Sequence, residues 1–223
     1  MSRAFTPIAG PRPNAPVVLW VIGLTCLPEI LFTLADSGLI TGLFGSIGPG
    51  LRQLGLIYGG FWRGLLMTWE PAFPGQPVAM FLSYALLHGG LIHLIGNMVV
   101  VLSLGGVVVG RLGQGGFVIL YALTAIGGAA GFALLSGSLS PMVGASGAVF
   151  GLIGAWQFWE FQDRRAAGAP LGPVGRTLVA LVLVNAAMWL FLDGLLAWEA
   201  HLGGFVAGWA WAALATPRAA RRF

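Results

Sequence analysis

The chain has 223 residues, of which 57% are hydrophobic and 8% charged, and its mean hydropathy is +0.89. A soluble domain carries about 25% charged residues, so the composition excludes an ordinary soluble protein and predicts an integral membrane protein. The net charge of +4 comes from arginines alone, and their positions favour a membrane-topology signal over nucleic-acid binding. The single cysteine, Cys26, excludes an intramolecular disulfide.

A transmembrane helix needs about 20 apolar residues. Segments of this kind lie at about 16–35, 79–109, 115–135, 143–162, 175–193 and 198–216, separated by helix-breaking residues. The first has no small-residue cleavage site behind it and is expected to remain as a signal anchor. The sequence therefore predicts an all-α polytopic membrane protein with six transmembrane helices over 16–216, an N-terminal tail over 1–15 and a basic tail over 217–223.

The connection between the first two segments, residues 36–78, is much longer than the others and is rich in proline and aromatic residues. This composition is typical of a loop that lies in the membrane interface. Arg52 and Arg63 fall in this loop, whereas the other nine arginines fall on the opposite side of the six predicted spans. The positive-inside rule then predicts that both termini are cytoplasmic and that the long loop faces outside.

The second segment contains three polar residues with the spacing H-x4-H-x3-N, namely His88, His93 and Asn97. His93 and Asn97 project from nearly one face of a helix, whereas His88 is offset by about 140°. His93 and Asn97 can direct donors at a developing oxyanion, and we expect His88 to tie the long loop to the outer helix ends. The alternative for His93 and Asn97 is interhelical hydrogen bonding without catalysis.

Ser146 lies near the start of the fourth segment, between Gly144 and Gly147. A helix N-terminus offers free backbone N–H groups and a positive dipole end, which suit the oxyanion formed in acyl transfer. We interpret Ser146 as a candidate nucleophile. A small-residue packing motif is the alternative for this run, since glycine, alanine and serine are common where membrane helices meet.

His201, near the start of the sixth segment, can supply the general base that a serine nucleophile needs. Gly204 and Gly208 follow on its face of the helix, and Gly147 and Gly151 repeat the same spacing after Ser146. Facing glycines let two helices approach closely, which would bring the two side chains together. Segments 2, 4 and 6 run in the same direction, so their polar clusters share one depth. The alternative for His201 is an interfacial histidine.

Carboxylates near His201 are poorly placed to orient it, because Glu199 is two residues away on the helix and Asp193 precedes it in a loop. We expect both to be solvated loop residues and favour a dyad over a triad.

Glu29, within the first segment, could face the bundle interior or form a hydrogen bond across helices. The chain has neither H-E-x-x-H nor G-x4-G-K-[ST], so we expect no metal, nucleotide or other cofactor.

Three motifs, HGGLIHLIGN, GASGAVFG and AHLGGFVAG, together resemble those of the rhomboid family of intramembrane serine proteases, in the same order and over nearly the whole chain. The resemblance implies a six-helix protease of a bacterial inner membrane that cleaves membrane proteins in or near their transmembrane segments. It implies a Ser146–His201 dyad and an oxyanion hole formed by His93, Asn97 and the Ser146 backbone N–H. It also implies that Phe150 packs against His201.

Trp62 and Arg63 resemble a tryptophan-arginine pair of the family's first loop but lie farther from the histidine motif than is usual, and Trp69 could fill part of that position. In the fifth segment, Met188, Trp189 and Phe191 suit a lateral gate for substrate.

A non-catalytic rhomboid-like protein that binds transmembrane clients is the main alternative to a protease, although such a protein would be expected to lack the serine or the base. A small-solute transporter would favour inverted repeats and broken helices.

Overall fold

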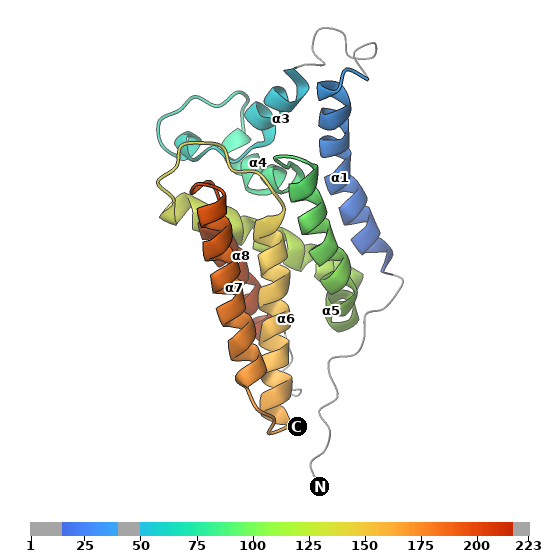
Figure 1. Cartoon of the computed structure of the whole chain (residues 1–223). Helices are drawn as coiled ribbons and strands as arrows, with labels where there is room; N and C mark the ends of the chain where they lie inside the picture. The colour runs from blue at the N-terminus through green and yellow to red at the C-terminus, as the bar shows by residue number, and fades with distance from the viewer. Residues whose placement is uncertain (1–14, 40–49, 216–223) are drawn as a thin grey trace.

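The computed structural model describes residues 15–39 and 50–215 (Figure 1). Most of the predicted tail 1–15, the basic tail 217–223 and part of the first loop lie outside the described residues. The helices of the described part are α1 (Pro16–Asp36), α3 (Leu51–Gly59), α4 (Gln76–Ser83), α5 (Leu91–Leu135), α6 (Ser146–Ala166), α7 (Gly172–Phe191) and α8 (Trp198–Ala215), with 3-10 turns at Arg63–Leu66 and Tyr84–Leu86. The predicted all-α fold class is confirmed.

The second predicted segment begins later than expected. The sequence predicted one span over 79–109, but α4 and a 3-10 turn occupy its start, and α5 begins only at Leu91. Gly90 has a φ of +138°, a conformation that side-chain-bearing residues rarely adopt, so the chain turns here before the helix starts. His88 therefore lies in the turn before α5, and the helical offset assumed for it does not apply.

The second and third predicted segments form one 45-residue helix, α5, that is broken at Gly113. Gly113 has φ +74° and ψ 176°, which is outside the helical region and is accessible chiefly to glycine. In Figure 1 the first half of α5 descends beside α1, and the later, yellow-green half crosses behind α6 and α7. The two halves of α5 thus serve as separate walls of the bundle.

Among residues 15–39 and 50–215, hydropathy and length alone single out α1, α5 and α7 as able to cross a membrane. Exposed apolar side chains cover these helices, including Trp20, Ile92 and Phe191. The helix α6 carries charged residues in its C-terminal half, and α8 is rich in glycine, alanine and tryptophan; the two helices pack against each other and against α5. The molecule is an integral membrane protein in which α5, α6 and α8 pack together as the centre of the bundle.

Glycines on α6 and α8 bring the two backbones into direct contact. A Cβ atom added to Gly204 would meet the carbonyl oxygen of Gly147, and one added to Gly208 would meet that of Gly151. Neither obstacle is a flexible side chain, so the structure leaves no room for any residue larger than glycine. This approach holds the start of α8 against the start of α6.

We therefore expect Gly208→Ala to lower the free energy of unfolding by at least about 2 kcal/mol, because overpacking here must move a backbone. Gly23→Ala in α1 is the matched control, since a Cβ atom at Gly23 would meet no atom within 4 Å. Alanine favours a helix over glycine by about 1 kcal/mol, so the control should be neutral or stabilising. Unfolding in mixed micelles measures both, and equal stabilities would contradict the close α6–α8 contact.

Candidate active site

Ser146 is the first residue of α6, one turn earlier in the helix than the sequence suggested. Its backbone N–H is therefore among the four that have no acceptor inside the helix. The preceding residue, Ala145, is fully buried and donates its backbone N–H to Nε2 of His88 at 3.4 Å. Ser146 thus begins a helix whose N-terminus is held by His88, which lies in the turn before α5.

His201 lies in the first turn of α8 and is buried. Its ring stacks on that of Phe150 with the centroids 4.2 Å apart and the planes within 6° of parallel. Ser146 and Phe150 are four residues apart, so they lie on one face of α6. The structure therefore holds the His201 imidazole against the α6 face that carries Ser146.

Asn185 on α7 also contacts His201 and was not predicted from the sequence. Its Oδ1 lies 2.5 Å from His201 Nδ1, and its Nδ2 donates to the carbonyl oxygen of Leu181 at 2.9 Å. The sequence could have indicated Asn185 as a candidate, because it is a polar residue within an apolar span and such residues are functional candidates by default. Its partner, however, lies on another helix and could not be read from the spacing.

His93 and Asn97 lie in the first two turns of α5. The His93 ring fits against Gly144, where an added Cβ atom would come within 2.6 Å of His93 Cε1. Gly144 has a φ of +128°, so both its conformation and its lack of a side chain admit the ring beside Ser146. Asn97 is buried and donates Nδ2 to the carbonyl oxygen of His93 at 3.1 Å, which leaves its second amide hydrogen free of that bond.

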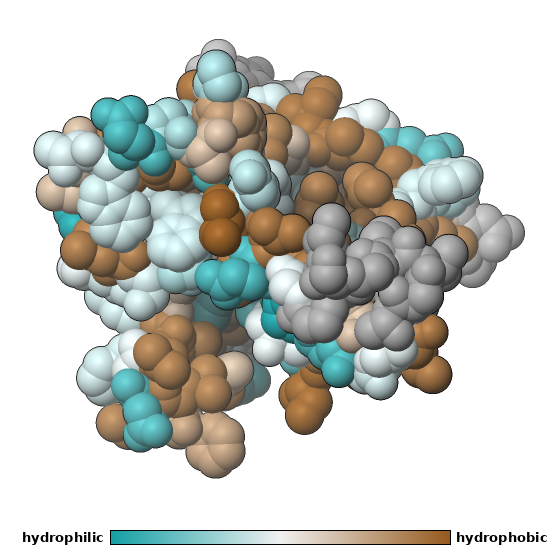
Figure 2. All heavy atoms as spheres, turned by 90° about the horizontal axis from the view of Figure 1, so that it is seen from above, coloured by the Kyte–Doolittle hydropathy of each residue, from teal (hydrophilic) through white to brown (hydrophobic). Residues whose placement is uncertain are grey.

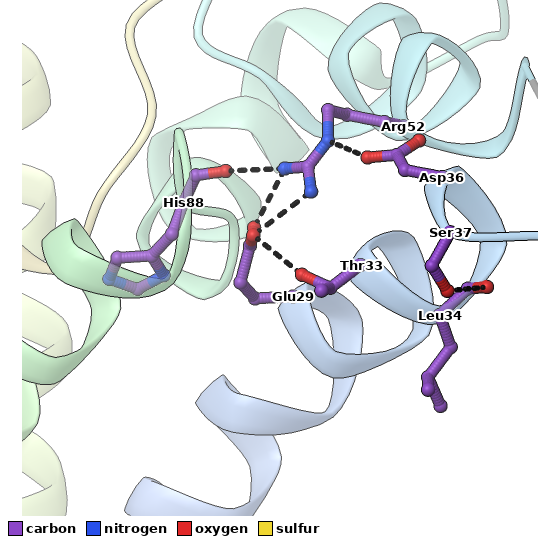
Figure 3. Close-up of polar contacts among 7 residues, drawn as sticks. All are labelled: Glu29, Thr33, Leu34, Asp36, Ser37, Arg52 and His88. Carbon is purple, nitrogen blue, oxygen red and sulfur yellow. Dashed lines mark hydrogen bonds and ion pairs between the residues drawn. The ribbon is translucent and has the colours of Figure 1, made fainter.

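A polar network connects α1 and the first loop to the histidine turn (Figure 3). Arg52 of α3 donates to both carboxylate oxygens of the fully buried Glu29 at 2.9 and 3.0 Å, and to Asp36 at 2.7 Å. It also donates to the backbone oxygen of His88 at 3.4 Å. The hydrogen bond to Glu29 is the main reason that the pKa of Arg52 lies above its usual value.

His88 therefore joins two parts of the molecule, since its backbone contacts the first loop and its ring contacts the residue before Ser146. Its ring also packs edge to face on that of His93, with centroids 5.0 Å apart. Glu29, whose partner could not be predicted from the sequence, begins this series of contacts. The network runs from α1 through α3 to the start of α6.

Trp62 and Arg63 act within the first loop and at its border with α5. The Trp62 indole donates to the carbonyl oxygen of Leu56 at 2.8 Å, and Arg63 donates to that of Ala133 at 3.0 Å. Trp69 packs beside Trp62, with ring centroids 6.0 Å apart. These contacts fasten the loop to the end of α5.

The two carboxylate residues near His201, Asp193 and Glu199, differ in their exposure. Asp193 lies in an exposed turn after α7, as expected. Glu199 was expected in a solvated loop, but it lies in the first turn of α8 and is 8% exposed, so that prediction was wrong. The cause is close packing, since the Glu199 backbone oxygen lies against Gly131 of α5. Among the described contacts, the side chain within hydrogen-bond distance of the His201 ring is the Asn185 amide of α7.

A cavity of about 560 Å³ lies between α7 and the pair α6 and α8. His201, Asn185 and Phe150 line it together with apolar side chains, among which Trp189 was predicted as part of a gate. Of the other predicted gate residues, Met188 and Phe191 are exposed and do not line the cavity. Figure 2 shows a hollow that separates a largely brown lobe, where Figure 1 locates α7, from the rest of the molecule.

Comparison with known proteins is consistent with this arrangement. A family model described as the Rhomboid domain matches residues 75–218, which is more than half of the chain. The chain is 31% identical to Rhomboid protease GluP of Bacillus subtilis over 134 residues, covering 60% of this chain and 25% of that protein. It is 36% identical to RHOMBOID-like protein 4 of Arabidopsis thaliana over 124 residues, covering 55% of this chain and 30% of that protein.

The chain thus spans well under half the length of these two relatives. It is also 26% identical to the Putative rhomboid protease YdcA of Bacillus subtilis over 208 residues, which covers 93% of this chain and 92% of that protein. The matched region contains all three polar motifs and the helices that bear them. The chain belongs to the rhomboid family.

Proposed function

We propose that this protein is an intramembrane serine endopeptidase that cleaves membrane proteins in or near their transmembrane segments. Ser146 is the nucleophile and His201 the general base. The observation that carries the proposal is the buried His201 ring, stacked on Phe150 against the α6 face that bears Ser146. Membership of a family with protease-named relatives supports the same reaction class.

In the proposed mechanism, the Ser146 hydroxyl oxygen attacks the carbonyl carbon of the scissile peptide bond while His201 accepts its proton. The tetrahedral intermediate collapses when His201 returns that proton to the leaving amine, which leaves an ester on Ser146. A water molecule, deprotonated by His201, then attacks the ester, and His201 returns that proton to the Ser146 oxygen as the bond to the acyl group breaks and the carboxylic acid product leaves. No metal or nucleotide takes part in these steps.

The proposed oxyanion hole consists of the Ser146 backbone N–H, the His93 ring and the remaining amide hydrogen of Asn97. The position of Ser146 at the first residue of α6 supports its part, because that N–H has no helical acceptor. The fit of His93 against Gly144 supports the second donor. The hydrogen bond from Asn97 to the His93 carbonyl orients the amide so that one N–H is still available.

The substrates are transmembrane proteins in the lipid bilayer of a bacterial inner membrane. The proposed route of entry passes α7, where the cavity beside His201 reaches the outside of the bundle. With both termini in the cytoplasm, as the arginine distribution favours, the site lies in the outer leaflet.

The test is to reconstitute the protein in vesicles with a model transmembrane substrate and to expose it to a fluorophosphonate, which labels activated serines. We expect cleavage and labelling by the wild type and loss of both in Ser146→Ala. Cleavage that persists in Ser146→Ala would overturn the proposal. A wild type that binds the transmembrane segment but neither cleaves nor labels would favour a non-catalytic rhomboid-like protein instead.

A further inference from the structure

We propose that Asn185 of α7 is a positioning residue that fixes the tautomer and orientation of His201, so that the base is competent only while α7 keeps its hydrogen bond to α8. This inference rests on the proposed function, because it assigns a third residue to the same site. It departs from the simple dyad that the sequence favoured.

The hydrogen bonds of the Asn185 amide determine which atom faces the histidine. The Leu181 carbonyl can only accept a hydrogen bond, so the amide atom 2.9 Å from it must be the nitrogen. The atom 2.5 Å from His201 Nδ1 is then the oxygen, which can only accept. The amide is therefore held by its own helix with its acceptor directed at the imidazole.

An acceptor at Nδ1 requires that this nitrogen carry the hydrogen. In a neutral imidazole the other nitrogen, Nε2, then carries the lone pair. A general base must have that lone pair on the nitrogen that faces the nucleophile, which is the role of the orienting carboxylate in a catalytic triad. Asn185 fills this position without adding a charge to a buried, apolar cavity.

The ring is held on a second side by packing. Phe150 stacks on one face of the imidazole with the planes nearly parallel, which limits its tilt. The contact with Asn185 lies in the ring plane and limits rotation about the remaining axis. The two contacts come from different helices, α6 and α7, so His201 is fixed only where the three helices meet.

Among the three long apolar helices, α7, which carries Asn185, is the least buried inside the bundle. Val174, near the start of α7, is the only residue of this helix that is buried, and the cavity separates much of α7 from α6 and α8. The bond to His201 therefore bridges a region with little other packing. A substrate segment that enters the cavity and displaces α7 breaks the hydrogen bond between Asn185 and His201. The position of α7 therefore controls the tautomer of the His201 ring.

The experiment uses the full-length protein labelled with ¹⁵N in the histidine rings. The chain has three histidines, and the signals absent from His201→Ala identify those of His201. The nitrogen chemical shifts report which ring nitrogen carries hydrogen. The variants are Asn185→Leu, which removes the acceptor, Asn185→Asp, which retains it, and Val182→Ala, a control that alters the same cavity wall.

We expect the wild type and Val182→Ala to hold hydrogen on Nδ1 of His201, and Asn185→Leu to move a large fraction of it to Nε2. We also expect Asn185→Leu to lower kcat for the model substrate by about 10-fold or more with little change in KM, as for other residues that orient a functional histidine. Asn185→Asp should restore the Nδ1 hydrogen and much of the lost kcat.

The inference is overturned if wild-type His201 carries hydrogen on Nε2, or if Asn185→Leu changes neither the tautomer nor kcat while the wild type cleaves. A changed tautomer with unchanged kcat also overturns it. The ring signals do not depend on turnover. A wild type that cleaves nothing but loses the Nδ1 hydrogen in Asn185→Leu would support the positioning contact and count against the protease function alone.

Discussion

Replacing both Ser146 and His201 with alanine is expected to reduce kcat no further than replacing either residue alone. Each single variant should lose activity by about a million-fold, because the nucleophile and its base act as one unit. Removing the base leaves the hydroxyl protonated, and removing the hydroxyl leaves the base without a function. The residual rate in all three variants would come from the oxyanion donors and from substrate binding.

Single-turnover cleavage in vesicles, at a high ratio of enzyme to substrate, measures these low rates. Ser103→Ala is a suitable control, since Ser103 is on α5 and donates only to the carbonyl oxygen of Val99 in its own helix. If the losses in the two single variants multiply in the double variant, the two residues act independently and the dyad is wrong. Appreciable turnover by His201→Ala would point to another base.

Replacing Glu29 with leucine is expected to lower the free energy of unfolding by about 1.5–3 kcal/mol, the contribution of a hydrogen bond to a charged group, because Arg52 stays partly exposed. Glu29 is fully buried and accepts two hydrogen bonds from Arg52. The variant leaves the arginine with only the exposed Asp36 as its charged partner. Because Arg52 also binds the backbone of His88, we expect the rate of cleavage to fall as well.

Asp36→Ala is the matched control, because it removes the other carboxylate from the same arginine. The Asp36 side chain is 42% exposed, so its loss should cost at most about 1 kcal/mol. A double variant with leucine at both positions 29 and 52 should recover much of the stability, since no unpaired charge remains. If Glu29→Leu proved no more harmful than Asp36→Ala, the buried pair would not hold α3 to α1.

The sequence predicts features that depend on local patterns. Apolar runs identified the helices, and helix periodicity correctly implied that Gly204 and Gly208 share a face. It could not locate the start of α5, because hydropathy does not register the φ angle at Gly90. The burial of Glu199 was missed for a related reason, since it depends on how closely α5 approaches α8.

Contacts between distant residues explain the remaining omissions. Glu29 and Arg52 are 23 residues apart and belong to different helices, so neither spacing nor periodicity relates them. The same holds for Asn185 and His201, which are 16 residues apart across the turn between α7 and α8. The motifs predict the chemistry, but the residues of α3 and α7 that contact the predicted site can be located only in the folded bundle.

The break at Gly113 determines the direction in which the second half of α5 and the helices after it cross the membrane. As a straight helix, the 45 residues of α5 would extend about 68 Å, roughly twice the thickness of a bilayer core. Without a reversal there, α6 would start from the opposite end of the bundle, and Ser146 would lie far from the histidine turn before α5. One glycine with a positive φ thus turns the chain back across the bundle, so that residues at the starts of α5, α6 and α8 lie on the same side of the membrane.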